Sequence, residues 1–131
     1  MTLGCLLFAI AGGMLGTAAR LGLGLVVPDA AGIPLSTLAV NVVGALLIGV
    51  LAARPFDRLR ERGRDTDLRV FLGTGILGGF TTYSAFAVGV VELSGDDPLA
   101  AVAYAVLTLV LGVAAAVLGM RLGRPRARSV A

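Results

Sequence analysis

A short polar stretch in the third apolar segment holds the residues best suited to chemistry in this sequence. It runs from Gly78 to Phe86 and reads Gly-Gly-Phe-Thr-Thr-Tyr-Ser-Ala-Phe. The interior of a bilayer offers no water to satisfy hydroxyls and main-chain groups, so these groups need partners or a water-filled path. Gly78-Gly79 is a poor helix interior and Thr81-Thr82 loses rotamer freedom in a helix. We therefore expect a broken helix whose carbonyls and hydroxyls bind an ion.

The composition requires a membrane around this stretch. The chain has 131 residues, of which 57% are hydrophobic, and this is too apolar for a soluble domain of that length. We predict an all-α integral membrane protein in which residues 1–131 form one domain and the third helix is broken near the midplane. The four apolar segments, each near the ~20 residues that span a bilayer, cover about 3–27, 35–53, 70–91 and 99–120.

Polar residues also occur within the other segments. Thr37 and Asn41 lie one turn apart in the second segment, and Tyr104 and Thr108 repeat this spacing in the fourth. Each pair alone is compatible with helix packing, since Thr can bond to its own helix and Asn can join two helices. On separate helices beside a broken third helix, they predict a polar track. Arg20 either extends to the membrane interface or concentrates anions in a vestibule.

Several chemistries are excluded by what the sequence lacks. The chain has no histidine and one cysteine, so it has almost no ligands for transition metals and forms no internal disulfide. The predicted spans contain no acidic residue, lysine or histidine for a proton relay, and no catalytic Ser/His pair or carboxylate pair is present. We do not expect an enzyme.

In the first span, the spacing of Gly12 and Gly16 predicts close helix packing.

The basic residues are concentrated on one side of the predicted membrane. All eleven are arginines. Ten lie in two places, the connector between the second and third segments and the tail after the fourth: Arg54, Arg58, Arg60, Arg62, Arg64, Arg69, Arg121, Arg124, Arg126 and Arg128. With four spans, the connector at 54–69 and the tail share one face, so the positive-inside rule predicts two cytoplasmic termini. Juxtamembrane arginines account for the basic charge, and we expect no nucleic-acid partner.

These residues together resemble the Fluc/CrcB family of fluoride ion channels. The matching motifs are Gly12-Gly13-Met14-Leu15-Gly16-Thr17-Ala18-Ala19-Arg20, Thr37-Leu38-Ala39-Val40-Asn41-Val42-Val43-Gly44 and Gly78 to Phe86, and Tyr104 and Thr108 fit the pattern of the fourth helix. The resemblance covers nearly all the chain except the tail. It implies a passive channel in the bacterial inner membrane that exports fluoride and confers fluoride resistance.

The resemblance also implies an assembly and a set of site residues. Family members are similar in forming antiparallel dimers with two pores and a central structural sodium ion. The main-chain carbonyls of Gly78 and Thr81 resemble the sodium ligands. The positions that match the anion pathway are Arg20, Thr37, Asn41, Tyr83, Ser84, Phe86, Tyr104 and Thr108. Hydroxyls, an amide and positive ring edges can replace fluoride's water while binding weakly enough for release.

Three positions depart from the family pattern. Tyr83 stands where Phe is usual, Ala85 where Thr is common and Gly89 where many members have Glu, and Glu92 follows three residues later. These departures concern rate and pore usage more than fold. Two other functions stay open: a small four-helix multidrug exporter, which would need a membrane-embedded carboxylate, and a non-conducting membrane assembly subunit.

The arginine distribution conflicts with a simple antiparallel homodimer. Such a dimer requires one sequence to insert both ways, and therefore nearly balanced basic residues on the two faces. Here one face has ten arginines and the other has at most Arg20. We therefore expect this subunit to pair with a related chain of opposite bias.

Overall fold

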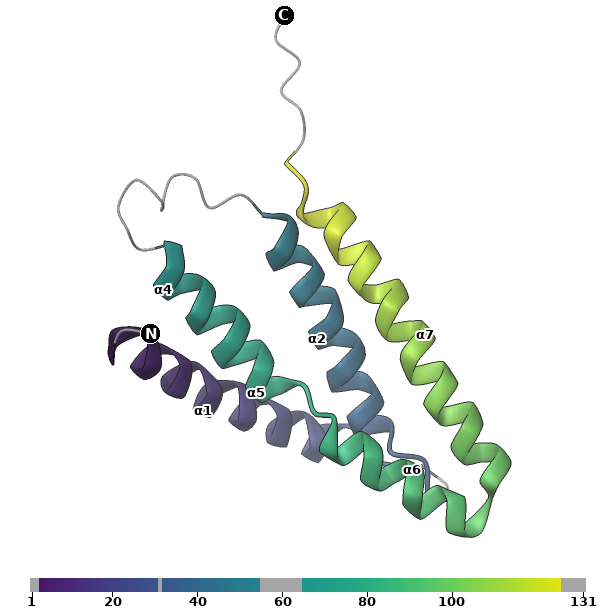
Figure 1. The fold of residues 1–131 in the computed structure, drawn as a ribbon. Helices are drawn as coiled ribbons and strands as arrows, with labels where there is room; N and C mark the ends of the chain where they lie inside the picture. Colours follow the sequence, from purple (N-terminus) through teal and green to yellow (C-terminus); the bar gives the residue numbers. More distant parts are fainter. Residues whose placement is uncertain (1–2, 31, 55–64, 126–131) are drawn as a thin grey trace, which may run out of the picture.

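The computed structural model describes residues 3–30, 32–54 and 65–125, and their regular structure is helical (Figure 1). The elements are α1 (Leu3–Val26), α2 (Leu35–Ala53), α4 (Asp65–Arg69), the π-helix η1 (Val70–Leu77), α5 (Gly78–Phe80), α6 (Ser84–Asp96) and α7 (Pro98–Gly123). Within the described residues, four stretches are long and apolar enough to cross a membrane: Leu3–Val26, Leu35–Ala53, Thr66–Asp96 and Pro98–Gly123. The predicted all-α membrane fold with four spans is confirmed.

The third and fourth helices extend beyond their apolar segments. The helical residues of the third span begin at Asp65 and end at Asp96, with a gap between α5 and α6. The next helix, α7, begins two residues later at Pro98. The carboxylate of Asp97 accepts hydrogen bonds from the main-chain N–H groups of Leu99 and Ala100, both at 3.0 Å. This N-cap, followed by proline in the first turn, replaces most of the loop that hydropathy alone suggests at 92–98.

Figure 1 shows the helices packed in pairs. The first half of the third span, α4 to α5, lies along α1, while α2 lies along α7. After the interruption, α6 contacts α7. The third span therefore packs on one neighbour before the interruption and on another after it.

Glycines allow close approach in both helix pairs. A Cβ at Gly12 would collide with the Phe71 carbonyl, and one at Gly16 would collide with the Ile76 carbonyl. Gly49 and Gly119 leave similar space where α2 crosses α7. The predicted packing role of Gly12 and Gly16 is confirmed, because both are buried against the main chain of η1.

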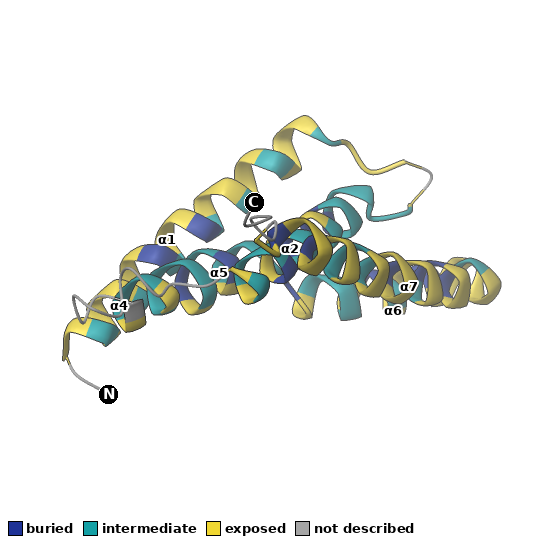
Figure 2. Cartoon of the chain, turned by 90° about the horizontal axis from the view of Figure 1, so that it is seen from above, coloured by how far each residue is buried: buried dark blue, intermediate teal, exposed yellow. Residues whose placement is uncertain are grey.

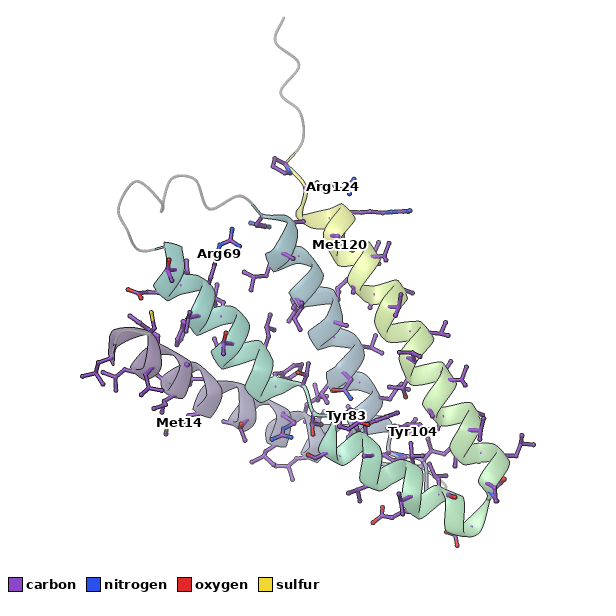
Figure 3. The ribbon with its side chains drawn as sticks, in the orientation of Figure 1. Met14, Arg69, Tyr83, Tyr104, Met120 and Arg124 are labelled. Carbon is purple, nitrogen blue, oxygen red and sulfur yellow. The ribbon has the colours of Figure 1, made fainter. Side chains whose placement is uncertain are left out.

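The described charged residues separate to the two ends of the bundle. Arg69 and Arg124 lie at the end where α2 and α7 finish and the third span begins (Figure 3). Cys5 is at this end too, with its thiol 3.3 Å from Asp67 Oδ1. Asp29 and Asp97 lie at the other end, and Asp29 accepts bonds from the main chain and hydroxyl of Ser36 at 3.2 and 3.0 Å. The arginines outside the described residues are Arg58, Arg60, Arg62, Arg64, Arg126 and Arg128.

Much of the apolar surface is not covered within one protomer. Figure 2 shows exposed positions along the length of α7 and along one side of α1. The buried hydrophobic residues are Val40, Leu77, Leu93, Ala101 and Tyr104. In contrast, Leu25 and Leu99 are 89% and 78% exposed. This inverted pattern fits a protein whose surroundings are lipid or another membrane subunit.

Candidate functional site

The third span is interrupted at Thr81–Tyr83, between α5 and α6. Thr81 is extended, with φ −77° and ψ 158°, whereas Gly78 is helical, with φ −65° and ψ −37°. The sequence points to both Gly78-Gly79 and Thr81-Thr82 as weak helix formers, and the structure places the interruption at the second pair while Gly78-Gly79 stays helical. Gly79 packs closely on the main chain of Gly13, and the Thr81 N–H still donates to the Leu77 carbonyl at 3.0 Å, so the helix continues through Phe80.

Asn41 of α2 binds the main chain of the interruption with both ends of its amide. Its Nδ2 donates to the Thr82 carbonyl at 2.9 Å, and its Oδ1 accepts from the Thr82 N–H at 2.9 Å. In a continuous helix that N–H would donate to the Gly78 carbonyl. The Asn41 side chain therefore takes the place of a helical partner. Of the two interpretations of Asn41, a contact between helices and a place in the polar track, the first is confirmed, and it gives Asn41 a positioning role.

The hydroxyl of Thr82 begins the second half of the span. It accepts a hydrogen bond from the Ala85 N–H at 3.2 Å and lies 3.2 Å from the Ser84 hydroxyl. Tyr83 directly precedes α6 and makes no side-chain cap bond, so the bond from Ala85 to the Thr82 hydroxyl supplies the capping contact from one residue further out. Sequence reasoning included Thr82 in the polar stretch but assigned it no role. The available signal was a Thr placed just before a new apolar helical run.

These contacts leave two carbonyls without their usual helical donors. The Thr82 N–H goes to Asn41 instead of Gly78, and the Ala85 N–H goes to Thr82 Oγ1 instead of the Thr81 carbonyl. The Thr81 hydroxyl donates back to Leu77 at 2.9 Å. The described residues contain no cluster of three His, Cys, Asp or Glu side chains. A cation at this point would therefore depend on main-chain oxygens, the kind of donor that a hard metal ion accepts.

Three aromatic rings lie against one another beside the interruption. Phe86 stacks on Tyr104 with ring centroids 5.8 Å apart and contacts Tyr83 at 6.0 Å. Tyr104 is 4% exposed, whereas Tyr83 is 81% exposed. Figure 3 shows both tyrosines at the junction of α5 and α6 with α2 and α7. Phe86 thus lies between a ring fixed in the core and a ring at the surface.

Two of the predicted polar-track hydroxyls make bonds inside the protomer. Tyr104 donates its hydroxyl to the Pro34 carbonyl at 3.4 Å, and Thr108 donates to the Tyr104 carbonyl at 2.7 Å. In this arrangement both hydroxyl protons are used, and only oxygen lone pairs are free. Ring edges and the second Nδ2 proton of Asn41 can still offer positive charge to an anion in this part of the protomer.

Two grooves open on either side of Thr82. The aromatic groove, of about 480 Å³, is lined by Asn41, Thr81, Thr82, Tyr83, Phe86, Thr108, Leu109, Gly112, Val113 and Ala116. The Arg20 groove, of about 430 Å³, is lined by Arg20, Leu21, Gly24, Leu25, Ser36, Thr37, Val40, Thr82 and Ala85. Thr82 is shared by both grooves, and Thr37 and Asn41, one turn apart on α2, line different ones.

Arg20 is the charged residue among those that line these two grooves. It is half-buried, and within the described part of the chain its Nε atom is buried without a hydrogen-bond partner. A guanidinium in or near a membrane span needs water or an anion. Its place in a groove beside Thr37 and Thr82 offers that contact.

Four membrane-spanning helices, one of them interrupted beside largely apolar grooves that carry an amide, hydroxyls and one guanidinium, define an integral membrane protein of the ion-pathway class. Residues 7–120 match the family model described as CrcB-like protein, Camphor Resistance (CrcB). The chain belongs to this family.

Curated relatives match along most of their lengths. The chain is 43% identical over 121 residues to fluoride-specific ion channel FluC 2 of Leifsonia xyli subsp. xyli, covering 90% of this chain and 82% of the relative. It is 44% identical over 115 residues to fluoride-specific ion channel FluC of Paracoccus denitrificans, with 86% and 89% covered. The FluC protein of Hyphomonas neptunium is 40% identical over 124 residues, with 92% and 95% covered.

We predict that Thr82→Val frays the start of α6, because valine keeps the shape of the side chain but cannot accept the Ala85 N–H. Hydrogen exchange of peptides covering 84–87 in the detergent-solubilised protein should accelerate about fivefold, as expected for the loss of a cap that contributes about 1 kcal/mol. Thr82→Ser keeps the hydroxyl and is the matched control. Equal exchange in the two variants would show that the hydroxyl does not cap the helix.

Proposed function

We propose that this protein is a fluoride-selective passive channel that exports fluoride and confers fluoride resistance. The supporting observation is the junction at Thr82, where an amide-bound interruption separates two largely apolar grooves that carry a few polar side chains, in a chain whose relatives are named fluoride-specific channels. Fluoride is small and strongly hydrated, so its path must supply donors in place of water. Ring edges, the Asn41 amide and Arg20 offer such donors without a ring of full charges, and conduction requires binding that is weak enough for release.

A proton-coupled exporter is less well supported. Such a transporter needs a membrane-embedded carboxylate to exchange cations and protons. The residues that line the aromatic and Arg20 grooves include no acidic side chain. A non-conducting assembly subunit would account for the glycine packing. It would not account for an arginine in a groove.

We also propose an antiparallel dimer as the conducting unit. The aromatic groove is open along one side of a single protomer, and Tyr83 beside it is 81% exposed. A second subunit would close the groove. If the two subunits were inverted relative to each other, their interruptions would lie at nearly the same depth in the membrane. Because the arginines strongly favour one orientation, the partner is proposed to be a related chain with the opposite bias. This chain would lie in the bacterial inner membrane with both termini cytoplasmic.

A structural sodium ion is proposed at the carbonyls of Gly78 and Thr81. Both carbonyls have lost their usual helical donors to Asn41 and Thr82, and Gly78 faces the outside of the protomer. A Cβ built at Gly78 would meet only the Gly73 carbonyl, at 3.7 Å. When bound, the ion would supply fixed positive charge near the anion path.

Liposomes that contain the purified protein with its partner subunit should release fluoride and retain chloride. Phe86→Ile keeps an apolar side chain but removes the ring edge, so fluoride efflux should fall about tenfold, the factor that follows from losing about 1.4 kcal/mol of ion stabilisation. Phe71→Ile is the matched control, because Phe71 packs on Phe8 and lines neither groove. Equal fluoride and chloride efflux, or a strict need for a proton gradient, would contradict the proposal.

Sodium should raise the melting temperature of the protein, and Thr81→Ala should keep this dependence because the ligand is the main-chain oxygen. The variant loses the bond from the Thr81 hydroxyl to Leu77 and so should be less stable overall by about 1 kcal/mol. Potassium is the control ion. If Thr81→Ala abolishes the sodium effect while Thr81→Ser retains it, the hydroxyl is a ligand and the carbonyl assignment is wrong.

Thiol labelling in intact cells tests the proposed orientation. Cys5 is the single cysteine and lies at the arginine-rich end, whereas Ser94 is exposed on α6 toward the other end. A membrane-impermeant reagent should leave Cys5 unlabelled and should label Ser94→Cys in a Cys5→Ser background. Comparable labelling of both sites, with robust fluoride flux from this chain alone, would show a dual-topology homodimer instead.

A further inference from the structure

A third groove lies away from the candidate ion path, at the arginine-rich end of the bundle. This Arg69 groove has a volume of about 340 Å³ and is lined by Ile48, Leu51, Ala52, Arg69, Gly73 and Thr74. It lies between the last turns of α2 and the first part of the third span. None of its residues lines the aromatic groove or the Arg20 groove. It therefore needs a separate account.

The walls of this groove change from polar to apolar along the membrane normal. Arg69 is the last residue of α4, directly before the apolar residues of η1, and Figure 3 shows its side chain on the side of α4 nearer to α2. Deeper in the groove, Ile48, Leu51 and Gly73 form an apolar surface, and Thr74 adds a hydroxyl. A guanidinium at the membrane surface complements an anionic lipid headgroup, and the apolar wall below it complements the start of an acyl chain.

Three further arginines lie at this end of the bundle, together with Asp67 of α4, which accepts a bond from the Cys5 thiol. Arg54 follows the end of α2, and Arg121 and Arg124 lie at the end of α7 on the same side of the bundle. All three are exposed. A guanidinium has five N–H donors in a planar fork that can bind two phosphate oxygens at once. Arg69 can therefore bind a phosphate while keeping another contact.

We propose that the Arg69 groove binds an anionic phospholipid, with the headgroup phosphate on Arg69 and the start of one acyl chain along Ile48, Leu51 and Gly73. The lipid would fill the space between α2 and the third span at the cytoplasmic side. The proposal is independent of fluoride conduction. The positive-inside rule counts Arg69 only toward the orientation of the chain, whereas the proposal gives Arg69 a bound ligand.

Native mass spectrometry of the purified full chain can measure this binding. Phosphatidylglycerol should bind more tightly than phosphatidylcholine, and Arg69→Gln should weaken phosphatidylglycerol binding about fivefold, which corresponds to the approximately 1 kcal/mol expected for one arginine near a membrane surface. Arg124→Gln is the matched control, because Arg124 is exposed at the same end but does not line the groove. Its effect should stay within about twofold.

A second pair of variants tests the apolar wall. A Cβ at Gly73 would first meet the flexible tip of Leu51, at 3.4 Å, so Gly73→Leu should fill the groove and weaken phosphatidylglycerol binding without displacing main chain. Gly22→Leu is its control, since a Cβ there meets nothing within 4 Å.

Equal losses in Arg69→Gln and Arg124→Gln would show diffuse attraction and overturn the site. Unchanged binding in Gly73→Leu, equal phosphatidylcholine binding, or competition by millimolar inorganic phosphate would overturn it as well.

Discussion

The organisation of the site depends on two hydrogen bonds from one side-chain amide. An interrupted helix inside a membrane exposes main-chain groups that would cost several kcal/mol each if left unpaired in hydrocarbon. Asn41 meets this requirement by binding the N–H and the carbonyl of Thr82. The Thr82 hydroxyl then satisfies the first turn of α6. Side chains therefore supply hydrogen-bond partners for the Thr82 main chain and the Ala85 N–H, whereas the Gly78 and Thr81 carbonyls lose their helical donors.

The interruption also explains how one span packs against two different neighbours. Before it, η1 and α5 contact α1 through glycine surfaces that allow the main chains to touch. After it, α6 packs on α7 around Leu93, Ala101 and Tyr104. The change of partner separates the helices locally. The aromatic and Arg20 grooves form on the two sides of this crossover, and Thr82 lines both.

The charged residues at the ends of the helices concern how the whole chain is placed in the membrane, whereas the grooves concern local binding. The described arginines outside the first span gather where α2 and α7 end and where the third span begins. They bias insertion toward one orientation, as the positive-inside rule requires. The same side chains provide a basic surface at the level of lipid headgroups. The proposed orientation, the proposed pairing with a second subunit and the proposed lipid site therefore all depend on one set of residues.

The sequence by itself determined the four spans, the glycine contacts of α1, the arginine asymmetry and the polar character of the third span. These properties depend on local composition and spacing, because apolar length and helical periodicity act over neighbouring residues. The bounds of the later helices needed more than hydropathy, since the Asp97 cap and polar ends extend the helices past their apolar parts.

Only the tertiary structure decided where the third helix breaks and what holds it. Local propensity pointed to Gly78-Gly79 and to Thr81-Thr82 alike, yet the glycines stay helical because Gly79 packs on Gly13 and the Thr81 N–H still has a helical acceptor. The break occurs at Thr81–Tyr83, next to the amide that Asn41 presents from another helix. The bond from the Thr108 hydroxyl to the Tyr104 carbonyl stays within one helix and follows from their spacing, but only the tertiary fold brings the Tyr104 hydroxyl to the Pro34 carbonyl. Such choices depend on partners distant in sequence, which spacing along one helix cannot reveal.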